Sequence, residues 1–139
     1  MQKTILVIGG TGLLGQPVSK SLKESGFGVR IMTRDLQKAR KTFDNSVELF
    51  AGDAMDTNCL EEALDGCHGV HISLPSEVEQ QVAETVSKLA AGHDVQRISY
   101  ISGTSVAEEH RWFPMVDRKF WAEKAIRESS IPYTIFCPT

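Results

Sequence analysis

Short apolar runs alternate with longer stretches of helical spacing along the whole chain. The run at residues 3–8 reads as a strand, and in residues 12–25 the side chains of Leu14, Val18 and Leu22 recur on one face of a helix. The same pattern predicts further strands at residues 28–33, 47–51, 69–74, 97–102 and 132–137, and helices at residues 35–43, 57–64, from 76 to a stop at Gly92, and 114–129.

This regular alternation predicts a doubly wound α/β fold. A helix between successive strands supplies the crossover connection that parallel strands require, and such sheets carry helices on both faces. At 139 residues the chain has the length of one domain, and it contains no internal repeat or linker-like segment. We therefore predict a single domain over residues 1–139, built around a parallel sheet.

The composition narrows the class of protein further. A hydrophobic content of 41% and a charged content of 24% are typical of a globular domain. The net charge of −3 offers no basic surface for nucleic acid or for an anionic membrane, and no apolar run reaches the length of a membrane span. The three cysteines and four histidines lack metal-ligand spacing, which predicts reduced thiols, a cytoplasmic location and no metal site.

The first predicted strand runs straight into a glycine-rich turn, Gly9-Gly-Thr11-Gly12-Leu13-Leu14-Gly15. Glycines let the backbone turn sharply and approach a pyrophosphate closely, and a helix that begins there aims its first amides at the anion. The position of the motif between a strand and an amphipathic helix favours dinucleotide binding. The alternative is a strand-turn-helix with no ligand.

Four further segments accompany this turn: Met32-Thr-Arg34-Asp35, Gly52-Asp53-Ala-Met-Asp56, Lys119-x-x-x-Glu123 and Ser130-Ile-Pro-Tyr-Thr-Ile-Phe-Cys-Pro138. Together these motifs resemble the NmrA-like family, an atypical branch of the short-chain dehydrogenase/reductase superfamily. The resemblance implies a Rossmann-like, NAD(P)-binding domain. It covers essentially all of this chain but only the N-terminal portion of a usual family member, so we expect the sequence to lack the C-terminal substrate-binding part.

The end of the second predicted strand bears on the choice of cofactor. An acidic side chain there bonds the ribose hydroxyls of NAD, whereas a cation accepts the 2′-phosphate of NADP. Arg34 follows the neutral Thr33, and its guanidinium can bind a phosphate through a planar fork. We interpret Asp35 as the cap of the next helix, which favours NADP over NAD. The alternatives are a solvated Arg34 and an Asp35 bound to ribose.

Other cofactor contacts come from the ends of the third and fourth predicted strands. Asp53 could accept the adenine amino protons, and the resemblance implies this contact, with the Ala54 backbone beside it. An ordinary turn aspartate is the alternative. The resemblance also implies that Ser73-Leu74-Pro75 packs against the ribose and pyrophosphate, although the same residues read simply as a strand exit into a helix cap.

The candidate catalytic residue is Lys119. Enzymes of the broad superfamily usually carry a tyrosine one helical turn before this lysine, where the ammonium lowers the pKa of the phenol and the phenol transfers the proton. Met115 stands in that position, and a thioether cannot transfer a proton. The resembled family includes lysine-only reductases, so Lys119 remains a candidate proton donor or cofactor clamp. A solvated helix lysine is the alternative.

Two classes of function follow from these residues. The first is an NADP(H)-dependent oxidoreductase that transfers a hydride to a small carbonyl, quinone or enone, as the reductases of the resembled family do. The second is a non-catalytic NADP(H)-binding regulator or redox sensor that acts on a partner protein. Loss of the phenol favours the regulator, and Lys119 favours the reductase. Neither class calls for direct contact with nucleic acid or a membrane.

Overall fold

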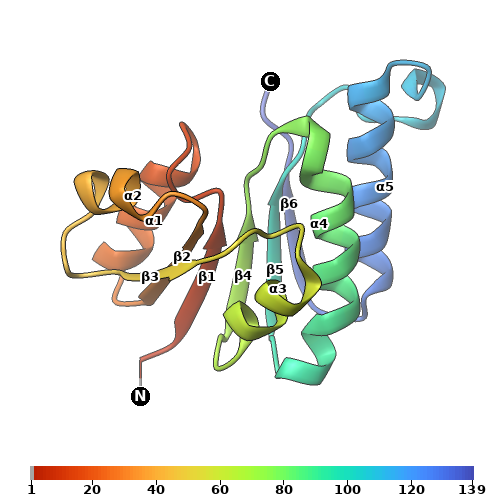
Figure 1. Cartoon of the computed structure of the whole chain (residues 1–139). Coiled ribbons are helices and arrows are strands. Elements are labelled where there is room, and N and C mark those ends of the chain that lie inside the picture. The colour runs from red at the N-terminus through yellow and green to blue at the C-terminus, as the bar shows by residue number, and fades with distance from the viewer. Residues whose placement is uncertain (1) are drawn as a thin grey trace.

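The computed structural model describes residues 2–139, and its centre is a six-stranded sheet in which every neighbouring pair of strands is parallel (Figure 1). The strand order is β3-β2-β1-β4-β5-β6. The strands are β1 (Thr4–Ile8), β2 (Gly28–Thr33), β3 (Glu48–Ala51), β4 (Gly69–Ile72), β5 (Arg97–Ile101) and β6 (Tyr133–Phe136). The helices are α1 (Gly15–Glu24), α2 (Leu36–Thr42), α3 (Thr57–Leu64), α4 (Ser76–Leu89) and α5 (Pro114–Glu128), with short 3₁₀ helices η1 (Ala90–His93) and η2 (Glu108–His110).

The order of the strands reverses between β1 and β4. From β1 the chain builds outward through β2 to β3, and it then crosses back to β4 and builds the other half of the sheet. A crevice forms at the carboxyl ends of the strands where the two directions diverge, and this is where open α/β sheets bind their ligands. The doubly wound parallel sheet predicted from the alternation of strands and helices is confirmed.

The pleat of the strands divides the core between the two faces of the sheet. Helices α3, α4 and α5 lie on one face of the sheet, and α1 and α2 lie on the other (Figure 1). On β1, Leu6 and Ile8 belong to the core cluster of the first face, whereas Val7 belongs to that of the second. The larger cluster contains the buried stripe of α4 and the inward residues of β4 and β5. The smaller cluster consists of Val7, Val29, Ile31 and Phe43 with the partly buried residues around them.

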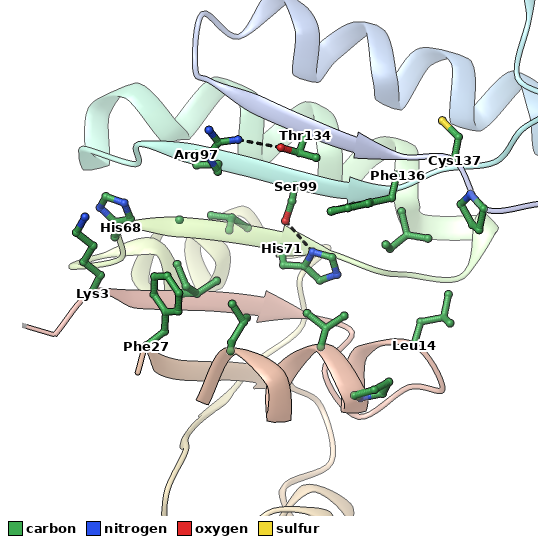
Figure 2. A pocket seen from close by; sticks show the side chains of 18 residues that line it. Lys3, Leu14, Phe27, His68, His71, Arg97, Ser99, Thr134, Phe136 and Cys137 are labelled. Atoms are coloured by element: carbon green, nitrogen blue, oxygen red, sulfur yellow. Dashed lines mark hydrogen bonds between the residues drawn. The ribbon is translucent and has the colours of Figure 1, made fainter. Parts of the chain in front are cut away.

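Half of one sheet face carries no helix in the described residues. The sheet-face pocket, a hollow of about 900 Å³ beside α1, lies over the strands β4, β5 and β6 (Figure 2). Three of its polar residues, His71, Ser99 and Thr134, lie in register across these three strands. Helices were expected on both faces, and both carry helices. The covering is unequal because right-handed crossovers place α1 and α2 over β1–β3, and α4 and α5 over the opposite face.

The ends of several elements depart from the predicted ranges. Helix α1 begins at Gly15 rather than residue 12, because residues 9–14 form the turn. Helix α4 ends at Leu89, and the chain then passes through η1 to Asp94, whose φ of 57° is left-handed. An aspartate therefore provides the left-handed turn after these helices, in place of the predicted stop at Gly92. No helix within residues 2–139 has the length and apolar character to cross a membrane.

Candidate functional site

A second hollow, the carboxyl-edge pocket, lies where the first four strands of the chain end. Its volume is about 590 Å³, and it receives residues from the turn after β1, from the ends of β2, β3 and β4, and from α4. Nine of the predicted cofactor residues line it: Gly9, Thr11, Gly12, Arg34, Asp53, Ala54, Ser73, Leu74 and Pro75. Residues far apart in the sequence thus meet at the crevice where the strand order reverses.

The glycines of the turn have different structural roles. Gly9 has a φ of 91°, and a Cβ atom there would lie 1.7 Å from the carbonyl oxygen of Ser73. A Cβ atom on Gly15 would lie 1.9 Å from the carbonyl oxygen of Gly9. A Cβ atom on Gly12 would meet only that same oxygen, at 3.3 Å. Protein packing therefore requires glycine at positions 9 and 15, whereas glycine at position 12 leaves room in the pocket.

Helix α1 begins beside the pocket without a side-chain cap. Leu14, at the N-cap position, makes no capping hydrogen bond, and the first turn contains no acidic residue. The preceding loop is held by Gln16, whose Nε2 donates to the carbonyl oxygen of Thr11 at 2.8 Å. A helix start of this kind presents backbone amides and the positive end of the helix dipole to an anion.

Two cations line the pocket at the end of β2. Arg34 and Lys38 are both exposed, and neither side chain makes a hydrogen bond or ion pair within residues 2–139. Asp35 caps α2, as predicted, with its Oδ1 accepting from the backbone amide of Lys38 at 3.0 Å. Lys38 was not among the site residues predicted from the sequence. Lys38 lies four residues after Arg34, in the first turn of the predicted helix, and residues at this spacing can lie on the same side of a helix.

The turn after β3 contains Asp53. Its Oδ1 accepts from the backbone amide of Met55 at 2.9 Å, which is the turn role that the sequence analysis weighed as an alternative. Its other carboxylate oxygen makes no hydrogen bond within residues 2–139, and the residue lines the pocket. Beyond β4, the backbone amide of Ser73 donates to the carbonyl oxygen of Ile8 at 3.0 Å. This bond fixes the exit of β4 against that of β1.

Four of the predicted site residues do not line this pocket: Leu13, Leu14, Gly15 and Lys119. Leu13 projects from the turn and is 91% exposed. Leu14 lines the sheet-face pocket on the other side of α1 (Figure 2). Gly15 contributes by letting α1 pack against the turn. Of the glycine motif, the pocket is therefore lined by Gly9, Thr11 and Gly12, and not by Leu13, Leu14 and Gly15.

Lys119 lies on α5, beside the exit of β5. Its Cδ atom lies 3.7 Å from the position that a Cβ on Gly103 would occupy. Its Nζ atom donates to Oε1 of Glu79 at 2.9 Å, and its side chain is 17% exposed. Glu79 follows Val78 on α4, and Val78 and Val82 line the carboxyl-edge pocket. The ammonium is thus held at the helix that forms one wall of the pocket.

The hydroxyl groups near Lys119 are engaged inside the protein. Ser102 is buried and donates to Glu123 Oε2. Tyr100 is fully buried and donates to Glu79, and burial together with that carboxylate raises the pKa of the Tyr100 phenol. Met115, one turn before Lys119, is 43% exposed. A phenol that is buried and holds its proton this firmly does not replace the tyrosine missing at position 115.

The sheet-face pocket has a different chemistry from the carboxyl-edge pocket. Its lining is mostly apolar, and His71 donates to or accepts from Ser99 through Nδ1 at 2.7 Å (Figure 2). Burial lowers the pKa of His71 to about 4, so the ring is neutral at pH 7. An apolar hollow with a neutral imidazole is unsuited to a pyrophosphate. The glycine turn, the uncapped start of α1 and the cations Arg34 and Lys38 lie at the carboxyl edge.

The doubly wound parallel sheet and the glycine turn at its carboxyl edge define a Rossmann-type domain. The profile of the NmrA-like family matches residues 1–139, and the chain belongs to that family. A curated relative, the photosystem II assembly factor Ycf39 of Trieres chinensis, is 30% identical over 142 aligned residues, covering 96% of this chain and 44% of the relative.

Two solved structures superpose on nearly the whole chain. The triphenylmethane reductase of Citrobacter sp., complexed with NADP(H), is 28% identical with a TM-score of 0.79, covering 95% of this chain and 48% of that protein. The NADPH-dependent quinone oxidoreductase of Escherichia coli, complexed with NADPH, is 26% identical with a TM-score of 0.79, covering 94% of this chain and 47% of that protein. The chain thus spans less than half the length of these three proteins.

Proposed function

We propose that this domain binds NADP(H) in the carboxyl-edge pocket. The observation that carries the proposal is the pair of cations, Arg34 and Lys38, at the end of β2. A cation at this place suits the 2′-phosphate that distinguishes NADP from NAD. Asp35, the carboxylate that an NAD site would direct to the ribose, is instead bonded to the first turn of α2.

The rest of the pocket fits the same cofactor. Gly12 leaves space beside the uncapped start of α1, where a pyrophosphate can approach the backbone amides. Asp53 offers one carboxylate oxygen at the place proposed for the adenine amino group. The triphenylmethane reductase and the quinone oxidoreductase, both structurally similar to this chain, were solved with NADP(H) and NADPH.

We further propose that the protein is a reductase of a small carbonyl, quinone or enone. The bound cofactor supplies the hydride in this chemistry. Lys119 is the proposed group at the reacting end, where its ammonium would donate a hydrogen bond to the substrate oxygen. Its place at the exit of β5, beside the wall formed by α4, supports this role. The two similar reductases support the reaction class.

The test is hydride transfer measured directly. NADPH stereospecifically deuterated at C4 is mixed with the protein and a panel of quinones and enones, and deuterium in the product is measured by mass spectrometry. We expect transfer from one face of the nicotinamide, and a loss of turnover of about 100-fold in Lys119→Ala. Lys124→Ala is the matched control, because Lys124 is an exposed lysine of the same helix that pairs with Glu128.

A second candidate function is supported by Met115. Without a proton-transferring side chain one turn before Lys119, the domain could bind NADP(H) and act on a partner protein instead. The similarity to Ycf39, whose name describes an assembly factor, agrees with such a role. Tight NADPH binding with no deuterium transfer to any substrate of the panel would favour this candidate over the reductase.

A further inference from the structure

A carboxylate is buried between α4, α5 and β5. Glu79 has no exposed surface, and its Oε1 accepts hydrogen bonds from the Tyr100 phenol and from Nζ of Lys119, the latter at 2.9 Å. Its other oxygen, Oε2, is buried and has no hydrogen-bond partner within residues 2–139. Two groups from two different elements thus meet on one oxygen atom of this side chain.

The position of Glu79 on α4 is one that packing alone would give to an apolar residue. It lies in the same buried stripe as Val82, Ala83 and Val86, at the spacing of one helix face. A buried carboxylate costs several kcal/mol of desolvation, and apolar residues of similar volume are often at least as stabilising as a buried ion pair. Stability therefore does not explain the choice of glutamate here, whereas its contact with Lys119 gives it a specific role.

We propose that Glu79 is a positioning residue that, together with Tyr100, fixes the ammonium of Lys119 at the exit of β5. The proposal rests on the reductase function proposed above. In the broad superfamily the lysine is paired with a tyrosine one turn before it, and Met115 cannot provide that partner. In this chain the partners of Lys119 come from α4 and β5 instead.

Tyr100 contributes to this arrangement in two ways. Its phenol donates to Glu79, and this bond fixes the carboxylate that Lys119 contacts. Its ring also lies beneath the lysine, with Nζ 5.8 Å from the ring centroid, close enough for a cation–π attraction. The ammonium is therefore held by a carboxylate on one helix and by an aromatic face on the sheet.

Chemical labelling of Lys119 tests this assignment without any need for turnover. Acetic anhydride acylates amines that reach solvent, and the bond to Glu79 holds the Lys119 side chain against α4 with 17% of its surface exposed. The full chain is labelled briefly at neutral pH, and acetylation of each lysine is quantified by mass spectrometry. We expect Lys119 in Glu79→Gln to react about tenfold faster than in the unmodified chain, because loss of the charge-assisted hydrogen bond frees its side chain. An unchanged rate at Lys119 would overturn the proposal.

Controls separate this effect from unfolding. Glu84→Gln changes a carboxylate of α4 that bonds Gln80 and not Lys119, and it should leave the rate at Lys119 unchanged. Lys88 and Lys124 serve as internal standards, because loss of the fold would also raise their rates. If Glu79→Gln does not fold, Glu79→Met supplies an apolar side chain of similar length, and the same tenfold increase is expected.

A kinetic readout distinguishes positioning from a purely structural ion pair. With NADPH and a substrate that the chain reduces, Glu79→Gln should lower kcat at least tenfold and leave the KM for NADPH unchanged. Equal losses in the Glu79→Gln and Glu84→Gln variants would contradict the assignment. If the unmodified chain reduces nothing, the reductase proposal fails, and the labelling result still decides whether Glu79 holds Lys119.

Discussion

The carbonyl oxygen of Gly9 lies 1.9 Å from the position that a Cβ atom on Gly15 would occupy. The start of α1 is therefore pressed against the turn that leaves β1, and only glycine permits this approach. A Cβ atom on Gly12, between them, would lie 3.3 Å from the same oxygen, and Gly12 lines the carboxyl-edge pocket. Glycine is thus required at position 15 for packing and at position 12 for the proposed binding site, and separate substitutions can test the two requirements.

Gly15→Ala tests the packing requirement. The added methyl group cannot fit unless α1 moves away from the turn, and overpacking of this kind typically costs about 1–3 kcal/mol. We expect the melting temperature to fall by several degrees, measured by circular dichroism or calorimetry. A melting temperature equal to that of the unmodified chain would show that α1 does not pack against the turn as described.

Gly12→Val tests the binding requirement. The valine side chain would occupy the space beside the first turn of α1, where the pyrophosphate is proposed to approach the backbone. We expect NADPH binding to be lost in a calorimetric titration, with a smaller change in melting temperature than in Gly15→Ala. Undiminished affinity for NADPH would remove the turn from the proposed phosphate site.

The two cations at the end of β2 should determine the preference between the cofactors. A charge-assisted hydrogen bond contributes about 1.5–3 kcal/mol, so Arg34→Ala should weaken NADPH binding about 10-fold to 100-fold. NADH binding should hardly change, because NADH lacks the 2′-phosphate. Lys38→Ala should show the same selectivity with a smaller loss. Lys41→Ala, an exposed cation later on α2 that does not line the pocket, is the control. Equal losses for both cofactors would assign Arg34 to the solvated surface.

Because His71 is buried, we expect the stability of the folded chain to depend on pH. Burial lowers its pKa in the folded chain to about 4, below the ordinary value of 6.5, so the unfolded chain binds the proton more readily. The contribution of the neutral His71 to the free energy of unfolding is complete above about pH 6.5 and is lost as the pH falls towards 4. Between pH 7 and pH 5 the free energy of unfolding should fall by about 2 kcal/mol from this residue alone.

Urea unfolding at the two pH values measures this effect. His71→Gln cannot be protonated in this range and should lose this part of the pH dependence, whereas His110→Gln, which changes an exposed histidine, should keep it. If the chain and His71→Gln show the same change in unfolding free energy between pH 7 and pH 5, then burial does not keep His71 neutral.

The sequence predicted the architecture well because its signals are local. Apolar runs of strand length, helical spacing and the cap at Asp35 each depend on a few neighbouring residues, and the structure confirms the elements and the parallel sheet. The ends of some helices were predicted less accurately than the helices themselves. The φ of 57° at Asp94, which precedes β5, is a conformation that glycine usually provides, and Gly92 was the obvious candidate in the sequence.

The candidate site was predicted only in part, because its remaining contacts join distant segments. No role was predicted for Glu79 from the sequence, and the packing of α4 against β5 and α5 buries it with Tyr100 and Lys119. Lys38 lies only four residues after Arg34, and this spacing was the one signal for it in the sequence. Leu14 belongs to the predicted glycine motif, but its side chain faces away from the carboxyl-edge pocket.

Calorimetric titration of the chain with NADPH and, separately, with NADH tests whether the carboxyl-edge pocket selects NADP(H). We expect NADPH to bind at one site per chain and at least tenfold more tightly than NADH, because Arg34 and Lys38 are proposed to contact its 2′-phosphate. Equal affinity for the two cofactors, or binding of neither, would contradict the proposed selection of NADP(H).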